Sequence, residues 1–152
     1  MSAHDNAGIL GSLRRIILLI LVFGLVGTGS ELLFIGHDEG ALQVIPLVLI
    51  ASGLGAVWWH ATFGTSSSLR VLRVIMGAFI SVGLLGVGLH YRGSMEFQLE
   101  VDPSLAGTAL FMKVMNSKTP PALAPGIMMQ LGLLGLAYTY RHTAFIERNK
   151  RR

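Results

Sequence analysis

Residues 16–36, IILLILVFGLVGTGSELLFIG, decide the fold of this chain. The stretch is about as long as the ~20 apolar residues that a helix needs to cross a bilayer. Three more apolar stretches of similar length follow, at 42–63, 71–91 and 122–140. We therefore expect an all-α integral membrane protein: a single membrane domain (residues 1–152) folded as a four-transmembrane-helix antiparallel bundle.

The composition agrees with a lipid environment. The chain has 152 residues, of which 52% are hydrophobic and 13% charged, and its mean hydropathy of +0.62 is too high for a soluble domain of this size. The sequence has no cysteine, which excludes disulfides, cysteine-ligated zinc and iron–sulfur clusters. The pI of about 10.0 does not indicate a nucleic-acid partner, because the basic residues flank the apolar stretches.

The distribution of basic residues predicts the topology. Arg92, Lys113 and Lys118 fall on one side of the membrane, and the other nine of the 12 basic residues fall on the opposite side. These nine are Arg14, Arg15, Arg70, Arg73, Arg141, Arg148, Lys150, Arg151 and Arg152. The positive-inside rule then predicts that both termini are cytoplasmic, in a membrane of the cytoplasmic type, with the basic tail 141–152 at anionic headgroups.

The first apolar stretch could also be read as a cleaved secretory signal, because Arg14 and Arg15 precede it and Gly27 and Gly29 lie within it. The stretch continues to Ile35, however, and is longer than the ~7–15 residues of a signal's apolar region. We therefore expect this span to be retained.

The segment 92–121 is predicted to form an extracytoplasmic excursion. Met95, Phe97, Leu99 and Val101 alternate with polar residues, a pattern of period two that is typical of a strand. Asp102 before Pro103 resembles a helix N-cap followed by proline at the first helical position, and predicts a short helix through about Met115.

Small residues and turn residues predict how the spans pack. Gly27 lies one turn before Glu31, and Gly86 one turn before His90, so each pair shares a helix face. Glycine lets helix backbones approach closely, and these faces are therefore expected to contact other helices. In the short connection 64–69, one of the hydroxyl side chains is expected to cap the next helix.

Glu31 is the most unusual residue of the spans, because a carboxylate near the end of an apolar helix needs a partner, water or a proton. His90, Arg92, Gln43 and Gln130 are its candidate partners by depth. Together they predict a polar pocket open to the outside. Such a pocket suits a proton, a cation or a small polar ligand. The sequence favours the other interpretation, in which these groups form a buried hydrogen-bond network that fixes the register of the helices.

The five histidines allow two kinds of cofactor site. His37, Glu39 and His90 form a candidate metal-ligand set on the outer face. A haem needs two histidines at matching depth on facing helices, which only the outer pair, His37 and His90, or the inner pair, His60 and His142, can provide. No close ligand spacing such as HExxH supports either cofactor, so the cofactor remains open.

No catalytic motif supports an enzyme: the sequence lacks a cysteine nucleophile, a phosphate-binding glycine loop and GxSxG. We predict a non-catalytic accessory, anchoring or assembly subunit of a membrane complex. Its expected partners are membrane lipids and either other membrane subunits or a second copy of itself. The alternative is a ligand-binding helical bundle for haem, a metal, a proton or a cation, built around Glu31, His37 and His90.

Overall fold

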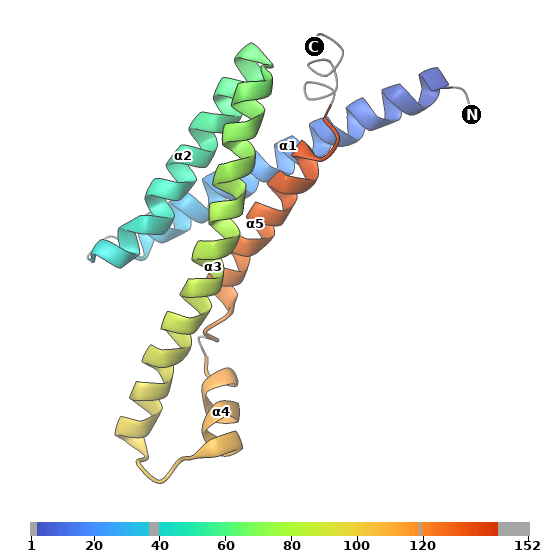
Figure 1. The fold of residues 1–152 in the computed structure, drawn as a ribbon. Coiled ribbons are helices and arrows are strands. Elements are labelled where there is room, and N and C mark those ends of the chain that lie inside the picture. The colour runs from blue at the N-terminus through green and yellow to red at the C-terminus, as the bar shows by residue number, and fades with distance from the viewer. Residues whose placement is uncertain (1–2, 37–39, 119, 143–152) are drawn as a thin grey trace.

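The structure, a computed structural model, describes residues 3–36, 40–118 and 120–142, with the backbone alone for residues 3, 4 and 7. Every regular element in these ranges is a helix (Figure 1): α1 (Ala3–Phe34), α2 (Ala41–Phe63), α3 (Ser66–Val101), α4 (Gly107–Met115) and α5 (Leu123–Thr139). In the described ranges, α2, α3 and the part of α1 from Gly8 to Phe34 are long and apolar enough to cross a membrane, and α5 is a shorter apolar helix of 17 residues. The prediction of an all-helical fold is confirmed, and the long apolar helices suggest a membrane protein. The number of spans, four in the prediction, and their orientation stay predictions.

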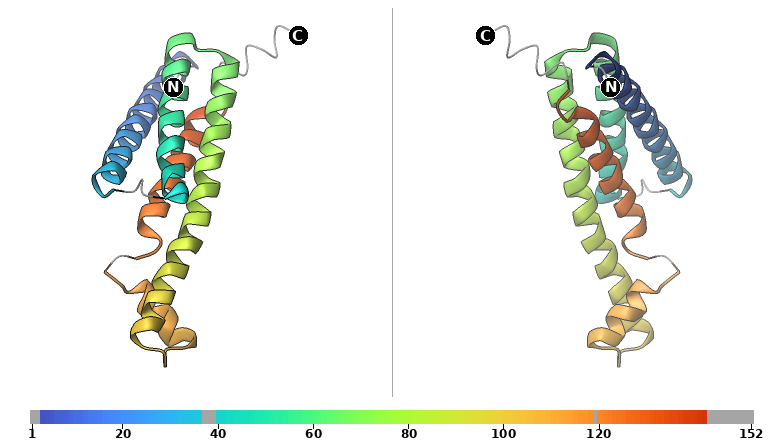
Figure 2. Two further views of the ribbon diagram at one scale, coloured as in Figure 1. Left: turned by 90° about the vertical axis from the view of Figure 1, so that its left-hand side faces the viewer. Right: turned by 90° about the vertical axis from the view of Figure 1, so that its right-hand side faces the viewer.

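The four apolar helices run in alternating directions (Figures 1 and 2). α3 packs against both α2 and α5, and α1 packs against the other sides of α2 and α5. The start of α1, the α2–α3 connection and the end of α5 therefore lie at one end of the bundle, which we call the loop end. Leu21, Leu25, Ile50, Phe79 and Leu131 fill the core between the four helices.

The contact between α3 and α5 is the most extensive in the molecule, and glycine makes it possible. A Cβ placed on Gly132 would lie 2.7 Å from the backbone oxygen of Met76, and a Cβ on Gly83 would lie 2.8 Å from the backbone oxygen of Pro125. Gly86 likewise lies against the Pro125 ring, as the small-residue pattern predicted. Gly27 differs, because no atom lies within 4 Å of the position that its Cβ would occupy.

Large apolar side chains cover the outer surface of the bundle. Phe23 is 81% exposed, Phe34 89% and Val74 72%, and many further leucines and isoleucines of α1, α2 and α3 are also exposed. In water such a surface would drive aggregation, whereas in a bilayer lipid chains cover it. The apolar stretches of the sequence thus supply the outer surface of the bundle as well as its core.

The predicted strand at residues 95–102 is wrong, because α3 continues as one helix to Val101. Adding residues to an existing helix is much easier than starting a new element, and a lone strand has no partner here. Arg92 and Glu96 also form an ion pair of 2.8 Å one helical turn apart. Tyr91, Met95 and Leu99 are partly buried, at a spacing of four residues that the alternating pattern concealed.

The predicted start of the short helix is also wrong, whereas its predicted end at Met115 is correct. Asp102 ends α3 and does not begin α4. Its carboxylate accepts hydrogen bonds from the Ser104 backbone N–H (3.0 Å) and from Ser104 Oγ (2.6 Å), which makes a tight Asx-type turn. These two bonds lower the pKa of Asp102, the side-chain bond being the larger cause. α4 then folds back along α3, and the Tyr91 and Phe111 rings lie 6.1 Å apart. We call residues 90–115 the arm.

The α2–α3 connection follows the predicted turn chemistry. Gly64 takes the left-handed conformation (φ 60°) that ends α2, and its N–H donates to the His60 carbonyl over 2.8 Å. Thr65 caps α3, because its side-chain oxygen accepts a hydrogen bond from the Ser68 N–H at 3.1 Å. The predicted hydroxyl cap is therefore confirmed. The turn brings the last residues of α2 against the first residues of α3.

Candidate functional site

Buried polar groups of the described residues gather at the loop end. His60 at the end of α2 is 5% exposed and Ser68 at the start of α3 is fully buried. Tyr138 in the last turn of α5 is 6% exposed, and His142 follows that helix. We call Thr65 together with these four residues the loop-end cluster.

The hydrogen bonds of the cluster assign the proton on His60. A hydroxyl has one hydrogen to donate and two lone pairs to accept with. Ser68 Oγ donates to the Thr65 carbonyl (2.8 Å) and accepts from Thr65 Oγ1 (3.1 Å). Its 3.0 Å contact with His60 Nδ1 must then use its second lone pair, so Nδ1 carries the hydrogen and donates it. The other ring nitrogen of His60, Nε2, consequently carries a lone pair.

Three rings meet above this hydrogen-bonded turn. The His60 ring lies nearly perpendicular to the Tyr138 and His142 rings, with centroids 5.8 and 5.2 Å away. Tyr138 and His142 also contact each other, with centroids 5.4 Å apart. Burial, together with the nearby His60 and Arg14 side chains, lowers the pKa of His142 to about 4. His142 is therefore a neutral imidazole at neutral pH.

Two arginines secure the end of α5 beside the cluster. Arg73 of α3 donates from Nε to Thr139 Oγ1 (3.2 Å) and from Nη2 to the Thr139 carbonyl (3.0 Å). Arg14 of α1 donates to the Arg141 carbonyl over 2.9 Å. The last carbonyls of a helix lack partners within the helix and carry its negative dipole end, so cationic donors suit them. These arginines thus have a structural role in addition to the topological role predicted for them.

The geometry of the cluster limits the chemistry that it can perform. A serine next to a histidine can act as a nucleophile when the histidine accepts the hydroxyl proton. Here His60 donates to Ser68, and the Ser68 proton is held by a carbonyl, so this pair is arranged as a helix cap. The contact between His60 and His142 leaves no gap for a haem macrocycle between the two rings. The cluster therefore brings two imidazole rings into contact, without an activated serine and without space for a haem between the rings.

The predicted polar pocket falls at the opposite end of the bundle, apart from Gln130. Glu31 near the end of α1, Gln43 at the start of α2 and His90 on α3 are all exposed. Arg92 is exposed too, and forms the ion pair with Glu96. His37 and Glu39 lie outside the described residues. Within the described ranges, no three histidine, aspartate or glutamate side chains lie close enough together to hold a metal ion.

Gln130 lies elsewhere, in the middle of α5. It is seven residues from Leu123 and nine from Thr139, and it is exposed on the face of α5 that points away from the bundle. Gly126, Leu133 and Ala137 share this face at helical spacing. No atom lies within 4 Å of the position that a Cβ on Gly126 would occupy, so the face is open. We call these four residues the outer face of α5.

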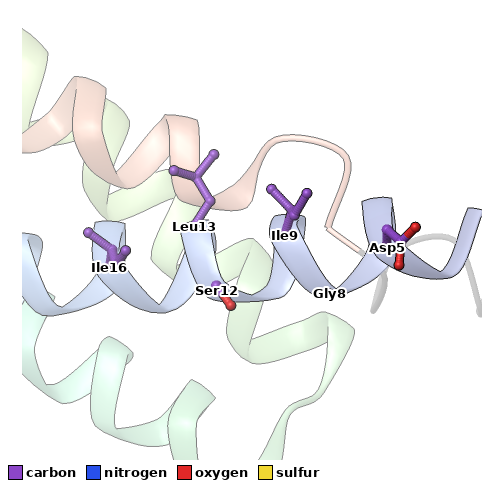
Figure 3. A pocket seen from close by; sticks show the side chains of 6 residues that line it. All are labelled: Asp5, Gly8, Ile9, Ser12, Leu13 and Ile16. Atoms are coloured by element: carbon purple, nitrogen blue, oxygen red, sulfur yellow. The ribbon is translucent and has the colours of Figure 1, made fainter. Parts of the chain in front are cut away.

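Two hollows on the surface of the described residues are each formed by a single helix. Figure 3 shows the more prominent one, which is lined by Asp5, Gly8, Ile9, Ser12, Leu13 and Ile16, all from α1. A second hollow is lined by six residues of α2 between Ala41 and Ser52. A site that binds a small molecule normally converges from several elements, whereas each of these is a groove on one helix.

Sequence reasoning identified the inner histidine pair but missed the Ser68 and Thr65 hydrogen bonds that orient it. The available signal was the position of His60 four residues before Gly64, and of Ser68 four residues after it. A tight turn at a glycine that ends a helix brings such residues face to face. Comparison of the chain with protein-family models, with curated proteins and with solved structures finds no match.

Proposed function

We propose that this protein is a non-catalytic subunit of a membrane complex, with both termini on the cytoplasmic side, and that it binds a neighbouring membrane helix through the outer face of α5. The observation that carries the proposal is Gln130. Its amide lies near the middle of an apolar helix, points away from the bundle and has no hydrogen-bond partner among the described residues.

The position of Gln130 favours a protein neighbour over lipid. An amide in hydrocarbon lacks the hydrogen bonds that water would give it, and leaving these unmade has a free-energy cost of a few kcal/mol. Across membrane helices, amide side chains form hydrogen bonds worth about 0.6 to 2 kcal/mol. Gly126 and Ala137, one and two turns away, present small side chains that allow a second helix to come close.

The proposal is tested by placing a photoreactive amino acid on the outer face. With the crosslinker at Leu133 in native membranes, we expect discrete protein adducts. Val74 of α3, which is 72% exposed, is the matched control and should react mainly with lipid. Gln130→Leu should reduce the Leu133 adduct about threefold to twentyfold, as expected for a loss of 0.6–1.7 kcal/mol. Equal adducts at positions 133 and 74, or no effect of Gln130→Leu, would contradict the proposal.

A second candidate function is a ligand-binding pocket at the end opposite the loop end. Its support is the alternation of helix directions, which puts the ends of α1 and α2 that flank residues 37–39 at the same end of the bundle as His90. Its residues are Glu31, His37, Glu39, Gln43 and His90, which suit a metal ion, a haem or a cation. The test is the metal content and visible spectrum of protein purified in mild detergent. A metal or Soret band that is absent from His37→Ala and His90→Ala would support this function, and a colourless, metal-free wild type would contradict it.

A further inference from the structure

The loop-end cluster contains two imidazoles that come from distant parts of the sequence and meet in space. His60 ends α2, and His142 follows α5. Their ring centroids lie 5.2 Å apart, and the ring planes are inclined by 78°. We propose that His60 and His142 together bind one divalent transition-metal ion of the kind that prefers imidazole, such as Zn²⁺ or Cu²⁺.

The first support is the way in which His60 is held. Histidines that bind metals nearly always donate the hydrogen of one ring nitrogen to an oxygen, which orients the ring and directs the lone pair of the other nitrogen to the metal. His60 Nδ1 donates to Ser68 Oγ at 3.0 Å, so Nε2 carries the lone pair. Ser68 is itself fixed by three hydrogen bonds with Thr65, so its position does not depend on the ligand.

The position of the cluster also fits an ion that arrives from water. His60 lies in the last turn of α2, and His142 lies beyond the end of α5 and is partly exposed. Because His142 is partly exposed, water would supply the remaining ligands of an ion bound there. Imidazole ligands suit Zn²⁺, Cu²⁺ and Ni²⁺, whereas Mg²⁺ and Ca²⁺ prefer oxygen.

Arg14 places a positive charge close to the proposed metal site. Its guanidinium donates to the carbonyl of Arg141, the residue before His142, over 2.9 Å. This hydrogen bond holds the positive charge beside the site, where it will repel a bound cation. We therefore expect moderate affinity in the wild type and tighter binding when this charge is removed.

The test uses the full chain in nanodiscs, in the background His4→Ala, His37→Ala and His90→Ala. This background keeps two of the five histidines, His60 and His142, and also removes the histidines of the second candidate function. With one equivalent of Cu²⁺, electron paramagnetic resonance should show coupling to two imidazole nitrogens, and calorimetry with Zn²⁺ should show one site. His142→Phe, which keeps an aromatic ring against Tyr138, should weaken binding at least tenfold and leave one nitrogen or none.

Two further variants separate a metal site from a packing cluster. Ser68→Ala should weaken binding about tenfold by releasing the His60 ring, as is typical of residues that orient a ligand. Arg14→Gln should tighten binding several-fold, an effect that loss of structure cannot produce. If His60→Phe fails to fold, His142→Phe and Arg14→Gln still decide the question. Absence of saturable binding in this background, or binding that His142→Phe leaves unchanged, would overturn the proposal.

Discussion

The two sides of α5 carry the same kinds of residue but have different surroundings. On the side facing α3, Gly132 and Gly135 lie directly against Met76 and leave no room for a methyl group. On the outer side, no atom lies within 4 Å of the position that a Cβ on Gly126 would occupy, and Gln130 is exposed. Small residues at helical spacing therefore identify surfaces suited to close contact between helices. They do not show whether the partner helix belongs to the same chain or to another.

The largest effect is expected at the side facing α3. Gly132→Leu would push a side chain into the Met76 backbone and should destabilise the fold by about 3 kcal/mol or more, because the two helices must separate to accommodate it. The thermal midpoint in mild detergent measures this loss. Gly126→Leu is the matched control on the other side of the same helix and should leave the midpoint nearly unchanged. Equal losses in both variants would remove the distinction between the two sides.

A smaller effect is expected where α3 caps α5. Arg73→Met removes two hydrogen bonds to Thr139 and should lower the free energy of unfolding by about 1 to 2 kcal/mol. Arg70, which donates to the Ser66 carbonyl on its own helix, is the control, and Arg70→Met should have little effect. If the two variants behave alike, the contact between α3 and α5 is stabilised by its glycines without this cap.

The loop end should also respond to pH. The pKa of His142 is about 4 in the folded protein, mainly because of burial, whereas a solvated histidine titrates near 6.5. The contacts of a neutral His142 thus contribute in full above pH 6.5 and are lost as the pH falls from 6.5 towards 4. In buffer with a chelator, the stability difference between the wild type and His142→Phe should shrink over this window. A difference independent of pH would show that the ring is solvated.

The smallest effect is expected on the arm. Arg92 and Glu96 are both exposed, and an exposed ion pair one helical turn apart stabilises a helix only weakly, because water and salt screen it. Arg92→Gln should therefore shift the thermal midpoint by less than the other variants, and the shift should disappear at high salt. A loss as large as that of Arg73→Met would mean that the arm packs as firmly as the contact between α3 and α5.

The sequence predicted the apolar parts of the helices well because long apolar stretches are easily recognised, and the end of α2 at Phe63 was predicted correctly. It failed where a helix leaves the hydrocarbon. α1 begins at Ala3, before the predicted start, and α3 continues to Val101, because hydropathy does not indicate where a solvated helix ends.

The candidate sites were less predictable than the fold. Hydropathy and depth indicated which histidines share an end of the bundle, and so identified His60 and His142 as a pair. The bonds that orient His60 depend on the left-handed turn at Gly64, and the contact with His142 depends on where α5 ends beside α2. The exposure of Gln130 depends on the rotation of α5 against α3, which packing at Gly132 decides. These features depend on how two helices pack against each other, so they cannot be predicted from the sequence of a single helix.

The unbroken length of α3 has a mechanical consequence. With 36 residues, the helix is about 54 Å long, whereas the hydrocarbon layer is about 30 Å thick. Ser68 at one end contacts His60, and Asp102 at the other end begins the turn to α4. If α3 tilts as a rigid body by 10° about its first turn, its far end moves by about 9 Å. A small displacement beside His60 and Ser68 at one end of the bundle would thus become a large movement of the arm at the other end.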